Sequence, residues 1–178
     1  MSNANKLYND YLDEIKKLIP RAQYDEIMSQ DMCELEFDFM GFLDVYKPLS
    51  LLIPKGYTII DFGCYLAAQC FFFAEHKKYI GVDNCTLKRF HTDNAAHYTK
   101  SIQDFIKDDF PKLQGDNLEY CAICSYVPDF EATEMVRKTF QNVFCFYPTS
   151  AKTEPLSLYR TIGLKRRHCE SENRYGNG

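Results

Sequence analysis

The sequence lacks any apolar run long enough to cross a lipid bilayer, and it contains no tryptophan. A transmembrane helix needs about 20 consecutive apolar residues, so we do not expect membrane insertion. An excess of basic residues is also lacking, because 21 Lys and Arg stand against 25 Asp and Glu, for a formal net charge of −4. This balance does not predict a nucleic-acid partner. No signal-peptide pattern opens the sequence, and it shows no internal repeat or low-complexity segment.

The number and positions of the cysteines indicate whether the protein resides in a reducing or an oxidising compartment. Eight cysteines are present, and most lie in apolar runs, where a free cysteine behaves as a small hydrophobic residue. We therefore expect a reduced, cytoplasmic protein and not a disulfide framework. The four histidines lack metal-ligand spacing, and we expect His91 and His97 at the surface. Cys121-x-x-Cys124 is a lone pair whose members would face opposite sides of a strand, so we predict no metal site.

Hydrophobic periodicity predicts one domain in which strands alternate with helices. Residues 58–84 have the pattern of a strand, a tight turn, a helix and a second strand. Further strands are expected at 97–102, 118–127 and 142–147, and helices at 86–96, 105–113 (with Asp104 as N-cap) and 130–141. This alternation predicts a Rossmann-like three-layer αβα sandwich around a mostly parallel sheet in the order 3-2-1-4-5.

The segments that flank this core have different patterns. We expect a helical N-terminal extension or lid at 1–55, the α/β core at 56–150, and a C-terminal segment with a polar tail at 151–178. A short helix after Pro48 is expected to bury Leu49, Leu51, Leu52 and Ile53. Residues 156–164 fit either a helix or a strand.

Acidic residues follow both strands of the 58–84 unit. Asp61 and Gly63 come at the end of the first apolar run, and Asp83 ends the second. The carboxyl ends of neighbouring parallel strands open onto a crevice that binds ligands, and a glycine there allows close approach to the backbone. Asp83 is therefore either an acceptor for ribose hydroxyls or a carboxylate that caps a turn or helix, and the sequence leaves both roles open.

Residues 56–147 resemble the class I S-adenosylmethionine-dependent methyltransferases. IIDFGC at 59–64 is similar to the first motif of that family, and YIGVD at 79–83 is similar to the second. The strand at 118–127 is similar to the fourth, whose end supplies catalytic residues in the family. The resemblance implies S-adenosylmethionine as cofactor. It implies cofactor contacts from Asp61, Gly63, Cys64, Tyr65, Asp83, Asn84, Ser101 and Ile102, and catalytic roles for Ser125 and Tyr126.

The sequence departs from the family pattern where the cofactor would lie. Tyr65 and Ala67 occupy glycine positions, and Ser101 stands where an acid near the adenine is expected. CSYVPD at 124–129 differs from the Asp/Asn-Pro-Pro-Tyr pattern, and the chain is short for the antiparallel strand pair that completes the family's sheet. Three functions stay open: a methyltransferase of unidentified substrate, an inactive relative that acts through protein contacts, or a protein that binds another nucleotide.

Overall fold

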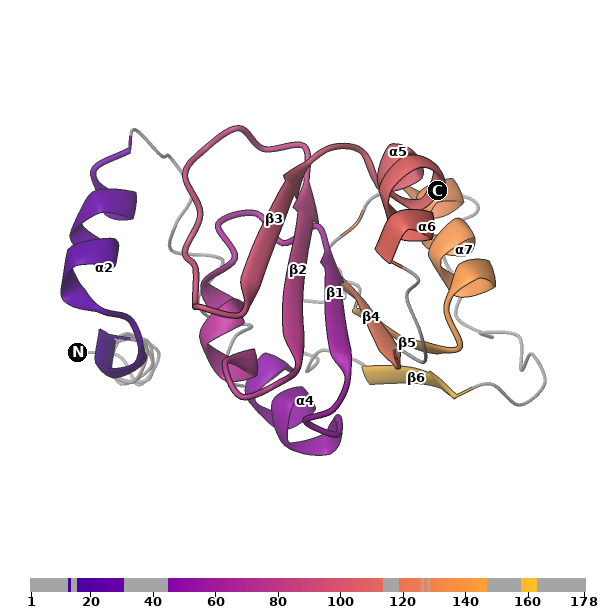
Figure 1. Ribbon diagram of the computed structural model, residues 1–178, viewed down its shortest axis with the longest axis horizontal. Helices are drawn as coiled ribbons and strands as arrows, with labels where there is room; N and C mark the ends of the chain where they lie inside the picture. Colours follow the sequence, from indigo (N-terminus) through magenta and orange to yellow (C-terminus); the bar gives the residue numbers. More distant parts are fainter. Residues whose placement is uncertain are drawn as a thin grey trace, which may run out of the picture.

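A six-stranded sheet forms the centre of the molecule (Figure 1). The computed structural model describes residues 13, 16–30, 45–113, 119–125, 127, 129–146 and 158–162, with residues 125, 146 and 158–162 as backbone only. The strands are β1 Thr58–Phe62, β2 Lys78–Asp83, β3 Ala95–Thr99, β4 Tyr120–Ser125, β5 Asn142–Phe146 and β6 Leu158–Ile162. The first five are parallel in the order 3-2-1-4-5. This confirms the predicted Rossmann-like α/β fold.

The sixth strand was not part of the predicted core. Residues 158–162 pair antiparallel with β5 at the edge of the sheet. The described part of the chain therefore includes an antiparallel strand, β6, at this edge, whereas the length of the chain had argued against the family's antiparallel pair. The sequence left this segment open between helix and strand, and its pairing with β5 decides for a strand.

Helices and helical turns cover both faces of the sheet (Figure 1). They are α2 Arg21–Met28, α4 Lys47–Leu52, the 3₁₀ helix η2 Ala68–Phe73, α5 Ile102–Asp104, the π-helical turn η3 Phe105–Asp109, α6 Phe110–Leu113 and α7 Phe130–Thr139. In the part of the chain that the structure describes, no helix is both long and apolar enough to cross a membrane. The apolar segment after β1, predicted as a helix, forms only the short η2.

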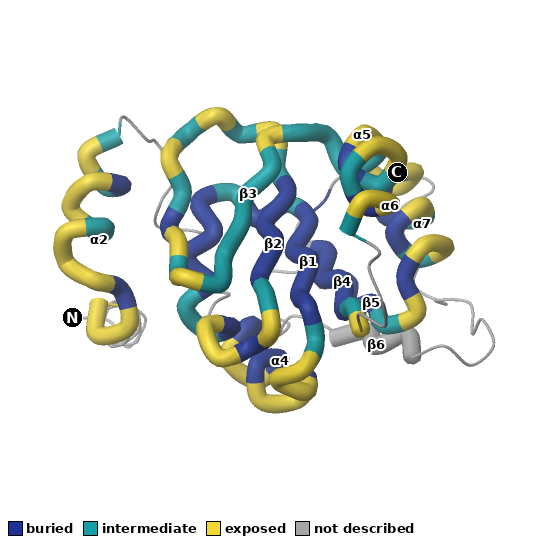
Figure 2. Tube along the Cα trace, viewed as in Figure 1, coloured by how far each residue is buried: buried dark blue, intermediate teal, exposed yellow. Residues whose placement is uncertain are grey.

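Two hydrophobic cores lie on opposite faces of the sheet. Successive side chains of β1 point to opposite faces, so this strand contributes residues to both cores. Ile59 packs in a core with α2, α4 and η2, whereas Ile60 and Phe62 pack in the other core with η3, α6 and α7. Figure 2 shows the buried residues concentrated along β1, β2 and β4. Cys121 belongs to the first core and Cys124 to the second, so the lone Cys-x-x-Cys pair does face opposite sides, as predicted.

Helix α7 illustrates how local sequence sets an element. The Asp129 carboxylate caps it by accepting the backbone N–H of Ala132 at 3.0 Å. Glu131 lies in the first turn and Arg137 and Lys138 lie in the last, the charges that a helix dipole favours at each end.

Helix α4 is less buried than predicted. Leu49 and Ile53 are buried, but Leu51 and Leu52 are 78% and 63% exposed. A helix of six residues presents only one side to the sheet, and the two exposed leucines lie on the other side. The prediction that both would be buried was wrong.

The secondary structure predicted from the sequence differs most from the structure in the connection between β2 and β3. Residues 86–94 form an irregular loop in place of the predicted helix, and β3 begins at Ala95. The following helix begins at Ile102, with Ser101 and not Asp104 as its N-cap; the Ser101 hydroxyl accepts the Asp104 N–H at 3.1 Å. Side chains from outside the loop bond to its backbone, a tertiary effect that polar periodicity does not reveal.

Candidate ligand site at the carboxyl edge of the sheet

The ends of β1 and β2 lie side by side, as the sequence predicted. The two strands are parallel, with Asp61 opposite Gly81 and Phe62 opposite Val82. Beyond β1 the chain turns at Gly63, whose φ of 76° belongs to the left-handed region that glycine adopts without strain. In open α/β sheets, ligands bind at the edge that such neighbouring strand ends and their turns form.

The turn after β1 is unusual because two non-glycine residues share this left-handed region. Tyr65 has φ 46° and Ala67 has φ 59°, at the positions where the resemblance places glycines. A non-glycine residue pays a steric cost there, so surrounding contacts must hold the turn.

Asp83 supplies one of these contacts at the end of β2. Its Oδ2 accepts the backbone N–H of Tyr65 at 2.9 Å, and its Oδ1 accepts the N–H of Cys85 at 2.8 Å. The carboxylate therefore holds the turn, which was one of the two predicted roles. Each carboxylate oxygen has a second lone pair, so a contact with ribose hydroxyls stays a prediction.

Arg89 is the residue at this edge that the sequence analysis missed. Its Nε donates to the Tyr65 carbonyl at 3.0 Å, its Nη1 to Thr99 Oγ1 at 3.0 Å, and its Nη2 to the carbonyls of Asp83 (3.0 Å) and Cys85. One guanidinium thus joins the turn after β1 to the ends of β2 and β3. No sequence signal singled it out, because an arginine in a polar segment is usually solvated.

Asp61 lies beneath the edge and not on it. It is fully buried, and its Oδ2 accepts hydrogen bonds from Tyr79 Oη and Gln69 Nε2, both at 2.6 Å. The Tyr46 hydroxyl lies 3.5 Å from its Oδ1. Burial raises the pKa of Asp61 to about 7, against the opposing effect of these hydrogen bonds.

Asp61 is connected to the first turn through Gln69, a contact consistent with the turn-ordering role that stays a prediction. The Gln69 amide donates to the Asp61 carboxylate and also to the Cys64 carbonyl at 3.1 Å. Both contacts tie η2 to the end of β1. Direct contact between Asp61 and a cofactor stays a prediction.

The backbone donors expected to face a cofactor have acceptors within the chain. The N–H groups of Gly63 and Cys64 donate to the Val82 carbonyl at 2.9 and 3.5 Å, and that of Tyr65 donates to Asp83. The Tyr65 ring is half-buried and packs against the core that contains η2.

Cys64 and His97 pack over Gly81 in the middle of β2. A Cβ on Gly81 would lie 2.7 Å from His97 Nδ1 and 2.8 Å from Cys64 Sγ. Burial raises the pKa of the Cys64 thiol, which argues against a nucleophilic role. His97 Nε2 donates to the Phe90 carbonyl at 2.8 Å, and burial lowers the pKa of this histidine to about 4. His97, expected at the surface, is a half-buried packing residue.

The remaining residues with predicted cofactor or catalytic roles lie at or just after the ends of β2, β3 and β4. Asn84 is exposed immediately after β2, and Ser101 and half-buried Ile102 follow β3 at the start of α5. Cys124 pairs with Phe62, so the Ser125 backbone stands one residue beyond the end of β1. Tyr126 lies outside the described residues. Catalytic roles for Ser125 and Tyr126 stay predictions.

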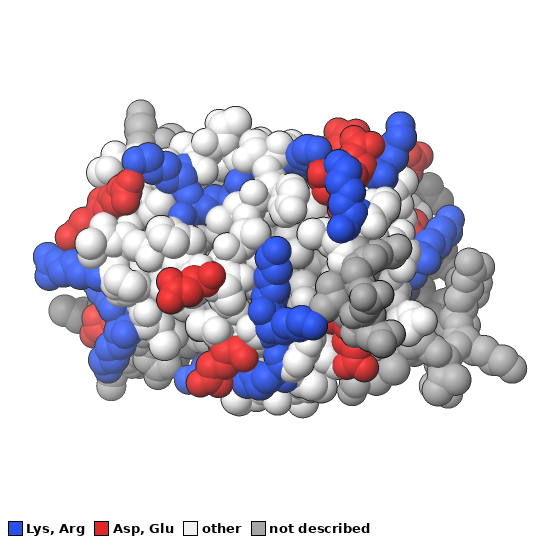
Figure 3. All heavy atoms as spheres, viewed as in Figure 1, with Lys and Arg blue, Asp and Glu red and all other residues white. Residues whose placement is uncertain are grey.

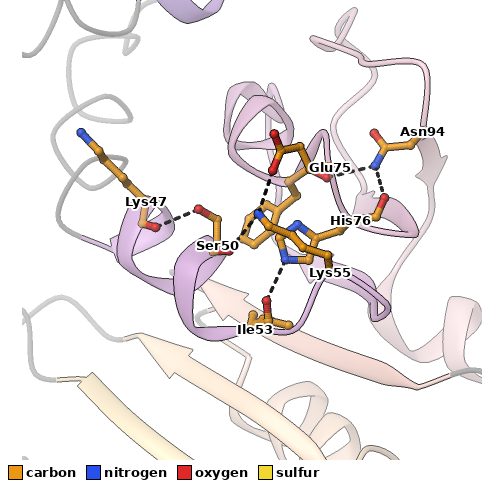
Figure 4. A network of polar contacts seen from close by, with 8 residues as sticks. Lys47, Ser50, Ile53, Lys55, Glu75, His76 and Asn94 are labelled. Carbon is orange, nitrogen blue, oxygen red and sulfur yellow. Dashed lines mark hydrogen bonds and ion pairs between the residues drawn. The ribbon is translucent and has the colours of Figure 1, made fainter.

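A second polar network lies away from this edge, between α4 and the segment that precedes β2 (Figure 4). The His76 ring bonds to the Ile53 carbonyl at 3.1 Å, and Lys55 pairs with Glu75 at 3.5 Å. The Asn94 amide donates to the His76 carbonyl at 2.9 Å. These contacts join α4, η2 and β3 at the amino ends of the strands, where a parallel sheet does not form its ligand crevice.

Charges on the face in Figure 3 are mixed, with basic and acidic side chains interspersed. Among the described residues, no group of three or more His, Cys, Asp or Glu side chains could hold a metal ion. At the carboxyl edge, the Asp83 carboxylate and the Arg89 guanidinium are the charged groups that join the strand ends, and both bond to the backbone of the chain.

Comparison with known proteins shows limited similarity. No protein-family model and no curated protein matches the sequence. A candidate type II methyltransferase from Anaeromyxobacter dehalogenans is similar in structure, with 13% identity, a TM-score of 0.42, and coverage of 59% of this chain and 47% of that one. A cyclopropane-fatty-acyl-phospholipid synthase-like protein from Lactobacillus casei has 11% identity, a TM-score of 0.47, and coverage of 77% and 57%. The chain spans about half the length of these structures.

Proposed function

We propose that the chain binds S-adenosylmethionine at the carboxyl edge of β1 and β2 and acts as a methyltransferase on an unidentified substrate. The observation that carries the proposal is the position of Asp83, anchored at the end of β2 beside the left-handed turn at Gly63. An acid in this place can accept both hydroxyl protons of a ribose.

In methyl transfer, the main task of the protein is to position the acceptor atom and the methyl donor relative to each other. The acceptor atom must approach the sulfonium methyl group in line, and no strong base is obligatory. Asp83 would hold the ribose, Ile102 would flank the adenine, and Ser125 and Tyr126 would lie nearest the transferred methyl group. The cofactor supplies the electrophilic methyl, and these residues supply its orientation.

A second candidate is a non-catalytic protein that acts through protein contacts. The specific observation in its favour is that the N–H groups of Gly63, Cys64 and Tyr65 all have acceptors within the chain. A cofactor that needs these donors would have to displace those contacts, at a cost for each unsatisfied group.

Isothermal titration calorimetry with S-adenosylmethionine and S-adenosylhomocysteine separates the two candidates. The first predicts micromolar binding that weakens at least about tenfold in Asp83→Asn, because one carboxylate acceptor is lost. Asp93→Asn is the matched control, since Asp93 is exposed in the same β2–β3 connection. Absence of heat with both ligands, in a protein that melts cooperatively, would reject the first candidate. Thermal melts with a panel of other nucleotides then test whether the protein binds a different nucleotide in the same place.

A further inference from the structure

We propose that α2 acts as a strap that positions Arg89, and that Arg89 in turn holds the ligand edge of the sheet in its binding conformation. Insofar as it concerns ligand affinity, this inference rests on the proposed function. It assigns a role to the N-terminal segment and to Arg89 that goes beyond cofactor contact, because neither needs to touch the ligand.

The first step is the way α2 holds the loop that contains Arg89. The Gln23 amide donates to the His91 carbonyl and accepts the His91 N–H, both at 3.1 Å. The Gln30 amide likewise donates to the Lys88 carbonyl at 3.1 Å and accepts the Lys88 N–H at 2.7 Å. Each glutamine therefore satisfies both backbone groups of one residue, as a neighbouring strand would.

The second step is that these two residues bracket Arg89. Lys88 precedes it directly and His91 follows two residues later, so the backbone on both sides of Arg89 is held, by Gln23 of α2 and by Gln30 just after the end of α2. Lys88 Nζ also pairs with Glu26 of α2 at 2.6 Å, and Ile27 of α2 is buried in the core. Figure 1 shows α2 standing beside the β3 edge of the sheet, next to this loop. The strap is thus fixed to the protein at one side and to the loop at the other.

The third step is what Arg89 does with its fixed position. Its guanidinium bonds to the carbonyls of Tyr65, Asp83 and Cys85 and to the Thr99 hydroxyl. Tyr65 is held in the left-handed region, which a non-glycine residue keeps only when its surroundings over-determine it. A lysine has one compact charge and cannot make this fork of contacts. Arg89 is therefore a positioning residue for the turn after β1.

Hydrogen exchange on the ligand-free protein tests the strap without any assumption about the cofactor. We expect the backbone N–H groups of Tyr65 and Cys85 to exchange about tenfold faster in Arg89→Lys and in the Gln23→Ala/Gln30→Ala double variant. The matched control is Arg21→Ala/Asp25→Ala, which removes an exposed pair within α2 that does not contact the loop. Exchange in β4 and β5 should stay unchanged in every variant, which separates a local effect from global destabilisation.

Rescue of the Arg89→Ala variant by added guanidinium tests whether the guanidinium group itself protects the turn from exchange. Millimolar guanidinium should restore exchange protection at Tyr65 in Arg89→Ala, whereas equal sodium should not. Unchanged protection in the glutamine double variant, or equal loss in the control variant, would overturn the inference. If Arg89→Ala does not fold, the glutamine variant still decides it.

Affinity measurements distinguish failure of the strap from failure of the proposed function. Wild-type protein that does not bind S-adenosylmethionine refutes the proposed function, and hydrogen exchange alone then decides whether the strap exists. Where wild-type protein binds, we expect about tenfold weaker binding in the glutamine double variant. Equal affinity in wild-type protein and that variant would overturn the positioning role.

Discussion

Replacing Asp61 by Asn should change how the stability of this protein depends on pH. The Asp61 carboxyl is fully buried, and burial raises its pKa from 3.8 to about 7. Asn has the same shape as the protonated acid. Its carbonyl can accept from Tyr79 and Gln69 as Oδ2 does now, and its amide would lie near the Tyr46 hydroxyl.

The sign follows from proton linkage. Because the folded pKa is raised, the native state binds more protons than the unfolded state between these two values. The stabilisation from Asp61 is fully present below about pH 4 and is lost as pH rises through about 7, at about 1.4 kcal/mol per unit. Asn does not titrate. The free energy of unfolding of wild-type protein should therefore fall, relative to Asp61→Asn, by about 3 kcal/mol between about pH 5 and about pH 8.

Urea denaturation of both proteins across this range measures the difference directly. Asp93→Asn is the matched control, because Asp93 is exposed and its removal should leave the profile parallel to that of wild-type protein. A difference between wild type and Asp61→Asn that stays constant with pH, or that grows in favour of wild type as pH rises, would refute the reasoning about burial.

Three further predictions concern packing, capping and thiol reactivity. Gly81→Ala places a Cβ 2.7 Å from His97 Nδ1 and should lower the free energy of unfolding by about 1–3 kcal/mol; equal stability in urea would mean that the neighbours move freely. Asp129→Ala removes the N-cap of α7 and should cost about 1 kcal/mol, whereas Asp129→Asn should cost less; the reverse order would exclude a capping role. Cys85 is half-buried and Cys64 is buried with a raised pKa, so mass spectrometry after brief thiol labelling should find Cys85 modified first. Earlier modification of Cys64 would contradict its burial.

The strands could be predicted from the sequence because each is an apolar run that ends at a turn. Ile59 and Ile60, or Ile80 and Val82, leave few alternatives to a buried strand. Alternation with helical segments then restricts the topology, since right-handed crossovers admit few sheet orders. The order 3-2-1-4-5 is one of those few.

The loop between β2 and β3 could not be predicted in the same way. Its polar composition fits a helix, but Lys88 and His91 bond to glutamines that lie far away in the chain, in and just after α2. Long-range contacts of this kind override local propensity and leave no periodic signal. The helix that follows β3 is a second example. Ser101 and Asp104 can both cap a helix, and the sequence does not say which of them does; the position at which β3 ends makes Ser101 the N-cap.

The sequence by itself determined the parallel sheet, its order and the meeting of the β1 and β2 ends, because hydrophobic alternation and chain connectivity suffice for these. Tertiary structure alone decided that Asp61 is sealed in the core, that Asp83 holds the turn, and that Arg89 joins three strand ends. Whether a carboxylate or guanidinium meets solvent or other groups depends on which segments fold over it, and that is a property of the whole chain.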